Sequence, residues 1–205
     1  MNIELKILNK EFYRDYENET TKKIEYCLPK YATRGSAGID LLTTEDVTIY
    51  PGEVKAIHTG LAIWISTWKR RYDVWKEMAI SFTSPEGRKE DEPIDIAGVI
   101  SPRSGLGTKG LVLANLTGWI DEDYQGELII QAWNRNNEYK TVDKYSNEGP
   151  WQEIEWNTEN KIELKAGDRI AQLVFIPIIK AQWELVEEFS EETKRGTGGF
   201  GHTGD

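Results

Sequence analysis

The sequence predicts a mostly β protein, built as an antiparallel sandwich or barrel. Short β-type segments recur along the chain, and turn residues such as Pro51-Gly52, Gly60 and Ala166-Gly167-Asp168 separate them. No long amphipathic helix stands between consecutive segments of this kind, which argues against a parallel βαβ fold.

The expected strands follow one another in two runs. In the first half of the chain they are Asn2 to Leu8, Gly38 to Leu42, Val47 to Ile49 and Val54 to Ile65. In the second half they are Leu111 to Asn115, Glu127 to Trp133, Lys161 to Leu164 and Ile170 to Pro177. A chain of 205 residues is long enough to bury the core that these strands need, so we expect one domain with insertions.

Composition narrows the classes of function. The formal net charge of -10 argues against a general nucleic-acid or membrane-surface binder, because phosphate neutralisation needs a basic field. The single cysteine, Cys27, excludes an internal disulfide and a cysteine zinc cluster, and it fits a reducing, cytoplasmic compartment. The longest apolar run, Ile170 to Ile179, is interrupted by Gln172 and Pro177, so neither export nor membrane spanning is expected.

Two charged stretches interrupt the strand pattern, Thr67 to Gly98 and Asn136 to Asn160. Each contains two of the eight tryptophans, and such apolar rings indicate that both are at least partly ordered. In the first stretch an apolar stripe follows an N-cap at Ser66 or Thr67 and predicts a short helix. The stripe consists of Trp68, Tyr72, Trp75 and Ala79.

Two segments have the composition of a phosphate site. Ser101 to Gly107 combines a rigid turn, a forked cation and a hydroxyl, although the same composition is also common in ordinary turns. The tail, Arg195 to Asp205, contains five glycines, an arginine and Phe200, which favours a lid over a nucleoside polyphosphate; a disordered glycine-rich terminus is the alternative.

The segment from Asn115 to Gly126 is a turn that ends in acidic residues and an aromatic ring. Asp121 and Asp123 could supply a general base, or they could simply cap the loop through Asx-turn hydrogen bonds. Composition alone leaves both alternatives open.

Five separated segments resemble, in order, the five motifs of the homotrimeric dUTPase family. They are Ala37 to Leu42, Pro102 to Gly107, Gly118 to Gly126, Ala166 to Leu173 and Arg195 to Gly201. The resemblance covers most of the chain except the two tryptophan-bearing stretches, which we take as insertions at about 67–98 and 136–160. It implies the jelly-roll-like β-clip fold of that family and a flexible C-terminal lid at about 194–205.

The resemblance implies hydrolysis of dUTP to dUMP and pyrophosphate, in active sites shared between the three subunits of a trimer. This reaction limits uracil incorporation into DNA and supplies dUMP for thymidylate synthesis. By motif position, Asp121 is the carboxylate that deprotonates the water attacking the α-phosphorus. Tyr124 lies under the deoxyribose and leaves no room for a 2′-hydroxyl. Main-chain groups from Asn115 to Gly118 read the uracil edge.

The remaining site residues also come from the resemblance. Phosphate contacts are expected from Arg103, Ser104, Gly105 and Gln172, with the lid residues Arg195, Gly201, His202 and Thr203 closing on the γ-phosphate and Phe200 stacking on uracil. Mg²⁺ is expected on the triphosphate, with Asp40 contacting it through a bound water. Without the family pattern, Asp40 would be read as a strand-end turn residue and Gln172 as an amide at the edge of the core.

The chain departs from the family pattern at the uracil hairpin. It is one residue shorter between Ser104 and Asp121 than many members, and Trp119 stands where a smaller residue is usual. Two alternative functions stay open, a dCTP deaminase-like activity and a nucleotide-gated regulatory binding protein. A deaminase would carry a second serine where Gly105 stands and would lack the glycine-rich lid. The insertions are expected to form surface for subunit packing or for a protein partner; the alternative is a local role in which each insertion covers its own β body.

Overall fold

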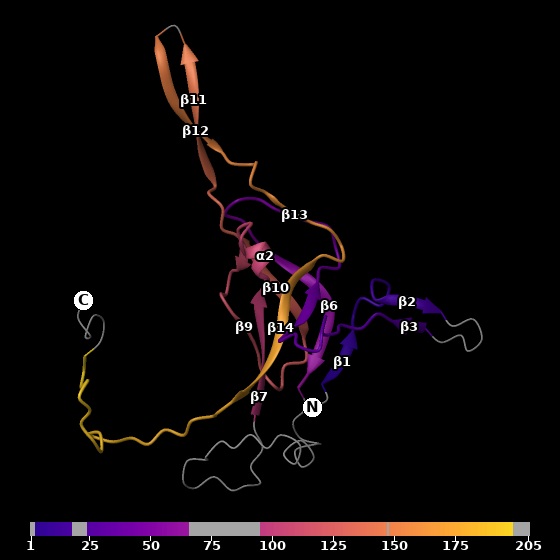
Figure 1. The fold of residues 1–205 in the computed structure, drawn as a ribbon, viewed down its shortest axis with the longest axis vertical. Coiled ribbons are helices and arrows are strands. Elements are labelled where there is room, and N and C mark those ends of the chain that lie inside the picture. Colours follow the sequence, from indigo (N-terminus) through magenta and orange to yellow (C-terminus); the bar gives the residue numbers. More distant parts are fainter. Residues whose placement is uncertain (1–2, 18–23, 66–94, 147, 199–205) are drawn as a thin grey trace.

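Two four-stranded antiparallel sheets form the body of the computed structural model, which describes residues 3–17, 24–65, 95–146 and 148–198 (Figure 1). The first sheet has the order β1 (Glu4–Ile7), β6 (Val54–Trp64), β10 (Glu127–Asn134) and β8 (Leu111–Leu113). The second has the order β4 (Ile39–Leu42), β14 (Arg169–Ile178), β7 (Asp95–Pro102) and β9 (Gly118–Ile120). The expected mostly β, antiparallel architecture is confirmed, and all eight expected strands form.

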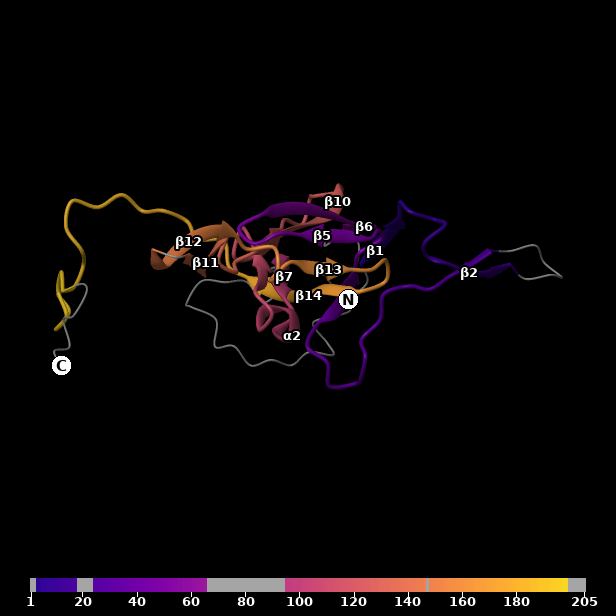
Figure 2. The same ribbon diagram turned by 90° about the horizontal axis from the view of Figure 1, so that it is seen from above.

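The core lies between the two sheets, which Figure 2 shows as two layers. Strand β10 alternates buried and exposed residues along its length, so one face of the first sheet packs inward while the other stays open. The buried cluster joins residues of both sheets, among them Ile57, Leu61, Leu128 and Ile130 of the first and Leu41, Ile100, Ile170 and Leu173 of the second. This packing fixes the strand registers that position the site.

Smaller elements complete the fold. Strands β5 (Val47–Ile49) and β13 (Ile162–Leu164) pair beside the body, and β2 (Arg14–Glu17) pairs with β3 (Ile24–Tyr26) in a hairpin that projects from it (Figure 1). The single described helix, α2, is one turn at Ser104–Gly107. The described part of the chain contains no helix with the length and hydropathy needed to cross a bilayer.

One boundary of the expected insertions is wrong. The first stretch was expected to reach Gly98, but β7 begins at Asp95 and Ala97 is buried, so residues 95–98 belong to the second sheet. No strand was expected at residues 95–102, because the charged residues before Asp95 and the turn composition after Ser101 hide its pattern. The short helix expected around Trp68 to Ala79 lies outside the described residues.

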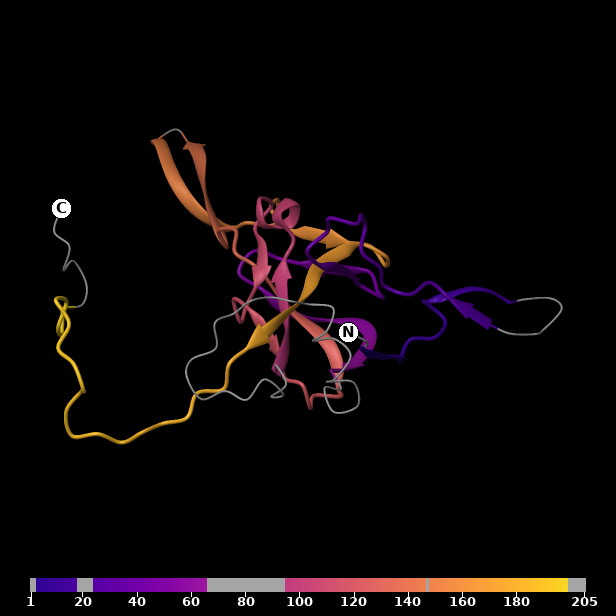
Figure 3. The same cartoon turned by 60° about the horizontal axis from the view of Figure 1, so that its bottom comes forward.

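The second insertion is a long hairpin. Strands β11 (Tyr139–Ser146) and β12 (Gly149–Trp156) pair along their whole length and extend away from the two sheets (Figures 1 and 3). Its base is fastened by Asn134, which is fully buried and whose side-chain amide donates to the carbonyls of Ile49 and Asn160. The tryptophans of this insertion therefore do lie in ordered structure, as the sequence indicated.

Candidate active site

Register in the second sheet brings three polar residues of the expected site together. Gln172 of β14 pairs with Asp40 of β4 on one side and with Ser101 of β7 on the other. Arg103 follows directly after β7, and its Nε lies 3.1 Å from Oδ1 of Asp40. Arg169 approaches the other oxygen of Asp40, with NH1 3.5 Å from Oδ2. A carboxylate flanked by two guanidinium groups is thus placed beside an amide.

Helix α2 presents backbone groups next to this cluster. Arg103 is its N-cap, and the carbonyl of Arg103 accepts the N–H groups of Leu106 and Gly107. The N–H groups of a first helical turn have no intrahelical partner, so those of Ser104 and Gly105 can receive an anion. Both residues are exposed.

The turn after α2 is tied to the base of the long hairpin. The Asn136 side-chain amide donates to the carbonyl of Lys109 at 2.9 Å, and the backbone N–H of Arg135 donates to the carbonyl of Gly110 at 2.9 Å. The second insertion is therefore anchored next to the residues expected to bind phosphate.

The expected uracil hairpin is a tight turn between β8 and β9. Leu116 occupies the left-handed region with φ 62°, and its N–H donates to the carbonyl of Leu113. The N–H of Thr117 donates to the carbonyl of Asn115 at 2.6 Å. A leucine in this conformation is strained by roughly 1–2 kcal/mol, and its side chain is 78% exposed, so burial does not compensate for the strain.

Asp121 lies in the turn that follows β9, which we call the Asp121 turn (residues 121–126). The carbonyl of Asp121 accepts the N–H of Tyr124 at 3.2 Å, and the carboxylate side chain is exposed. The Tyr124 hydroxyl donates to the carbonyl of Glu127 at 2.9 Å. Tyr124 folds so closely over Gly126 that a Cβ there would overlap the phenol ring. The absence of a side chain at residue 126 thus permits this close approach of the ring.

Within one chain, Asp121 and Arg103 stand at different ends of β7. Gly98 of β7 pairs with Ile120, directly before Asp121, whereas Arg103 follows five residues further along the chain. At 3.3 Å per residue this is a separation of roughly 17 Å along the strand. The phosphate cluster and the Asp121 turn of a single chain therefore do not meet.

The tail residues are only partly described. Arg195 lies in a local turn, with its Nε donating to the carbonyl of Gly198 at 2.8 Å. Residues 179–197 are exposed along an arm that leads away from the body (Figure 1). The other four expected lid residues, Phe200, Gly201, His202 and Thr203, lie outside the described residues.

Comparison with known proteins decides the family. The dUTPase family model matches residues 80–147 and 154–204. A deoxyuridine 5′-triphosphate nucleotidohydrolase of Haemophilus influenzae is 42% identical over 183 residues, covering 88% of this chain and 89% of its own length. The chain belongs to the dUTPase family. The corresponding Histophilus somni protein is 43% identical over the same coverage.

Solved dUTPases share the fold. The dUTPase of Staphylococcus bacteriophage 80alpha, determined with dUPNHPP, is 27% identical and superimposes with a TM-score of 0.65 over 100% of this chain and 99% of its own. A D95N dUTPase from phage phi11, described with a structural Mg(II) ion, gives a TM-score of 0.57 at 25% identity, over 93% of this chain and 100% of its own.

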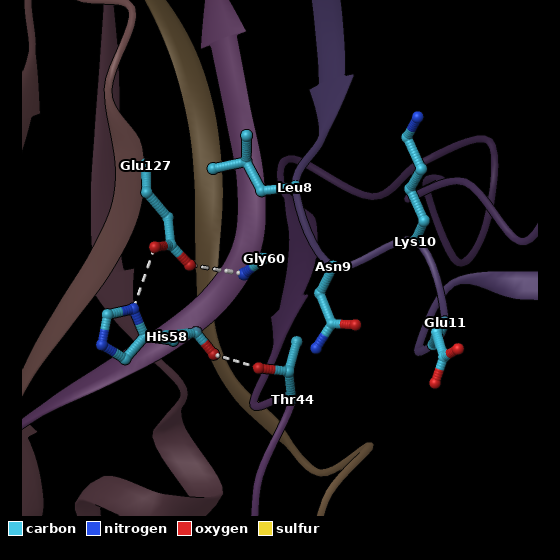
Figure 4. A pocket seen from close by; sticks show the side chains of 8 residues that line it. All are labelled: Leu8, Asn9, Lys10, Glu11, Thr44, His58, Gly60 and Glu127. Carbon is cyan, nitrogen blue, oxygen red and sulfur yellow. Dashed lines mark hydrogen bonds and ion pairs between the residues drawn. The ribbon is translucent and has the colours of Figure 1, made fainter.

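Several residues at the site escaped sequence reasoning. Arg169 was not expected beside Asp40, although it directly precedes the buried run of β14. Glu127 and His58 form a pair at 2.9 Å from Nδ1 to Oε2, and they line an open hollow of about 520 Å³ (Figure 4). No motif marks this pair, because the two residues are far apart in sequence and meet only through the β6–β10 register.

Proposed function

We propose that this dUTPase hydrolyses dUTP to dUMP and pyrophosphate by attack of a water on the α-phosphorus. The observation that carries this function is the sequence identity of 42–43% to dUTP nucleotidohydrolases, which extends over 89% of their length. The enzyme is accordingly a dUTP diphosphatase, and its reaction removes dUTP and supplies dUMP.

Asp121 is proposed as the general base. Its carboxylate is exposed on a turn whose backbone is held by the Tyr124 N–H, so it can accept a proton from a water bound between it and the substrate. Tyr124 supports the deoxyribose, and its ring would collide with a ribose 2′-hydroxyl. The strained hairpin at Leu116 offers main-chain groups to the uracil edge, with Asn115 and Gly118 on its two sides.

The phosphates are proposed to bind at the cluster on the second sheet. Arg103, Ser104, Gly105 and Gln172 are the residues that would contact them. Arg103 supplies a forked donor that is now paired with Asp40, and the exposed N–H groups of α2 supply uncharged donors beside it. This set suits an anion that arrives with its own cation, because it combines donors with one carboxylate.

Mg²⁺ is the proposed cation. Among the described residues no three acidic, histidine or cysteine side chains gather in a metal-ligand cluster, and Asp40 is a carboxylate in direct contact with the phosphate donor Arg103. One carboxylate with phosphate oxygens and retained waters is a donor set that Mg²⁺ accepts, and the residues therefore fit it. The ion would offset negative charge on the triphosphate, and Asp40 would hold one of its waters.

We further propose that the active site is completed between subunits of a homotrimer. The separation of Arg103 from Asp121 along β7 supports this arrangement, because one chain alone does not bring these two residues together. The exposed arm supports it too, since an arm leaving its own body can carry Arg195 and the lid to a neighbouring subunit. Closure of that lid would exclude water from the phosphates.

The test is a panel of deoxynucleoside and ribonucleoside triphosphates assayed for both pyrophosphate and ammonia. Release of pyrophosphate from dUTP alone is the expected result. Ammonia from dCTP would instead establish the deaminase-like alternative. If neither product forms, the protein binds nucleotide without turning it over. Sedimentation at several protein concentrations tests the trimer in the same samples.

A regulatory role is a second candidate. Phage dUTPases, including the 80alpha enzyme, are described as controlling transfer of virulence genes by a proto-oncogenic G protein-like mechanism. Here the long hairpin leaves several large apolar side chains open on one face and is anchored next to the phosphate cluster. A protein partner on this hairpin could therefore respond to the bound nucleotide, alongside catalysis.

A further inference from the structure

Glu127 joins the Asp121 turn to strand β10, and strand β6 binds both oxygens of its carboxylate (Figure 4). The backbone N–H of Gly60 donates to Oε1 at 2.8 Å, and Nδ1 of His58 lies 2.9 Å from Oε2. The glutamate side chain is 21% exposed and the histidine 52%. The carboxylate is thus the less exposed partner of this pair. One of its oxygens is held by His58 and the other by the backbone of Gly60, both on β6.

The β6–β10 ladder is irregular at this point. Glu127 pairs with Ala62 but Ile129 pairs with His58, so β6 bulges between them. Gly60 sits in the bulge with φ 68°, a conformation that other residues adopt at a cost. The carboxylate of Glu127 accepts the Gly60 N–H that the bulge removes from the ladder. A second side chain, Thr59, donates to the carbonyl of Leu128 at 2.6 Å.

The backbone of Glu127 carries a separate contact to the site. Its carbonyl accepts the hydroxyl of Tyr124, so the phenol is fixed at its far end by the same residue whose carboxylate is locked to β6. Any change that lets Glu127 shift relative to β6 moves the acceptor of that hydrogen bond. The ring of Tyr124 is 41% exposed, and its hydroxyl bond to Glu127 and its close approach to Gly126 are contacts that bear on its position.

We infer that Glu127, held by His58 and Gly60, is a positioning residue that fixes the ring of Tyr124 and thereby sets the preference for deoxyribose over ribose substrates. This inference rests on the proposed function, in which Tyr124 lies under the sugar. Glu127 acts through Tyr124. A ring free to tilt would leave room for a 2′-hydroxyl. Loss of the anchor should therefore lower the ratio of kcat/KM for dUTP to that for UTP more than it lowers the turnover of dUTP itself.

The anchor is sensitive to pH through His58. The hydrogen bond with Glu127 is the largest influence and raises the pKa of His58, partial burial opposes it, and the charges of Glu127 and Glu45 add to the rise. Lys10 and Glu11 face the same hollow from the segment after β1. Because the pKa is raised, the ion pair is complete below about pH 6.5 and is lost as the pH rises through the raised value.

The test compares kcat/KM for dUTP and for UTP in the full-length enzyme and its variants. In Glu127→Ala the ratio of the two should fall about tenfold, equivalent to the loss of one well-placed contact. Glu127→Gln keeps an acceptor for the Gly60 N–H and should lose less. The control is Glu163→Gln, which breaks a surface ion pair with Lys161 (2.8 Å) on β13 and should leave the ratio unchanged.

Tyr124→Phe separates positioning from folding. It removes only the hydroxyl, so it should lower the same ratio. If both residues act through one hydrogen bond, the double variant with Glu127→Gln should have a ratio close to that of Tyr124→Phe alone. In the unmodified enzyme the ratio should decline from pH 6 to pH 8, while in His58→Gln it should stay flat.

The outcomes distinguish the two proposals. If the unmodified protein does not hydrolyse dUTP, the proposed function fails. If it does, and Glu127→Gln and Tyr124→Phe both fold and keep the full dUTP preference, the positioning role is overturned. Should Glu127→Ala unfold, these two milder variants still decide.

Discussion

Arg103 and Asp40 form an ion pair across two strands of the second sheet, with Nε 3.1 Å from Oδ1 and side chains that are 32% and 23% exposed. Arg103 is expected to bind phosphate and Asp40 to hold a metal-bound water, so two groups with expected roles at the site also pair with each other. Substrate binding would exchange this pair for contacts of Arg103 with phosphate and of Asp40 with hydrated Mg²⁺.

Asp40→Asn should raise the Mg²⁺ concentration needed for half-maximal dUTP hydrolysis by about tenfold, a usual cost when a residue that orients a metal's surroundings is lost. A Mg²⁺ titration at fixed dUTP measures it. Asp143→Asn, on the hairpin and bonded only to Gln152 in the described contacts, is the matched control. An unchanged Mg²⁺ requirement would remove Asp40 from the metal site.

Asp121→Asn should abolish turnover while largely keeping affinity for Mg²⁺-dUTP, because the amide fills the same space but cannot accept a proton from water. Loss of a general base usually costs on the order of 100-fold or more in kcat. Asp123→Asn, in the same turn, should stay near the unmodified rate. A kcat of Asp121→Asn within about tenfold of the unmodified enzyme would contradict the assignment.

Leu116 tests how much strain the uracil hairpin stores. Leu116→Asn should increase the free energy of unfolding by about 0.5–1 kcal/mol, because asparagine tolerates positive φ and the leucine side chain is exposed. Leu116→Val should lower it, since a β-branched residue is a poorer fit there. Urea unfolding of the three proteins measures both changes, and equal stabilities would mean that the hairpin relaxes without strain.

The tail gives a prediction about the lid. Truncation after Thr193 should leave a folded trimer whose kcat/KM for dUTP is severely reduced, because Arg195 and the glycine-rich residues contribute little apolar surface to folding but close over substrate. Circular dichroism and sedimentation report on the fold and the assembly. Unchanged kcat/KM would refute the lid, whereas loss of the trimer would make the tail a structural arm.

Sequence reasoning reached the strands with clear apolar alternation, such as β10 and β13, because burial of one sheet face leaves a period of two. It missed β9, which has three residues, and the whole of β7, which was divided between an expected insertion and an expected phosphate-binding turn. The motifs predicted site roles for Asp40, Arg103 and Asp121, and these roles stay predictions. The contact of Arg169 with Asp40 and of His58 with Glu127 depends on strand register, which no local pattern specifies.

The hairpin β11–β12 presents one apolar face that its own chain leaves open. Tyr139 pairs with Trp156 and Thr141 with Ile154, and Tyr145 follows on the same face. Trp156, Ile154 and Tyr145 are 64%, 72% and 78% exposed. The opposite face carries the ion pairs of Lys140 with Glu159 and of Lys144 with Glu155. A two-stranded hairpin is marginally stable alone, so a covered apolar face would be expected to strengthen it.

Replacing residues 139–156 with a short Gly/Ser linker, while keeping Asn136 and Asn157, should therefore leave the trimer and dUTP turnover within about twofold, because exposed segments away from a site change little. Tyr145→Ser with Ile154→Thr tests the apolar face alone, and Val142→Thr on the opposite face is its control. A protein partner that binds the unmodified enzyme and the control but neither altered form would support the regulatory role. Loss of turnover in a replacement that still trimerises would overturn the accessory assignment, because it would place residues of the hairpin strands in or beside the active site.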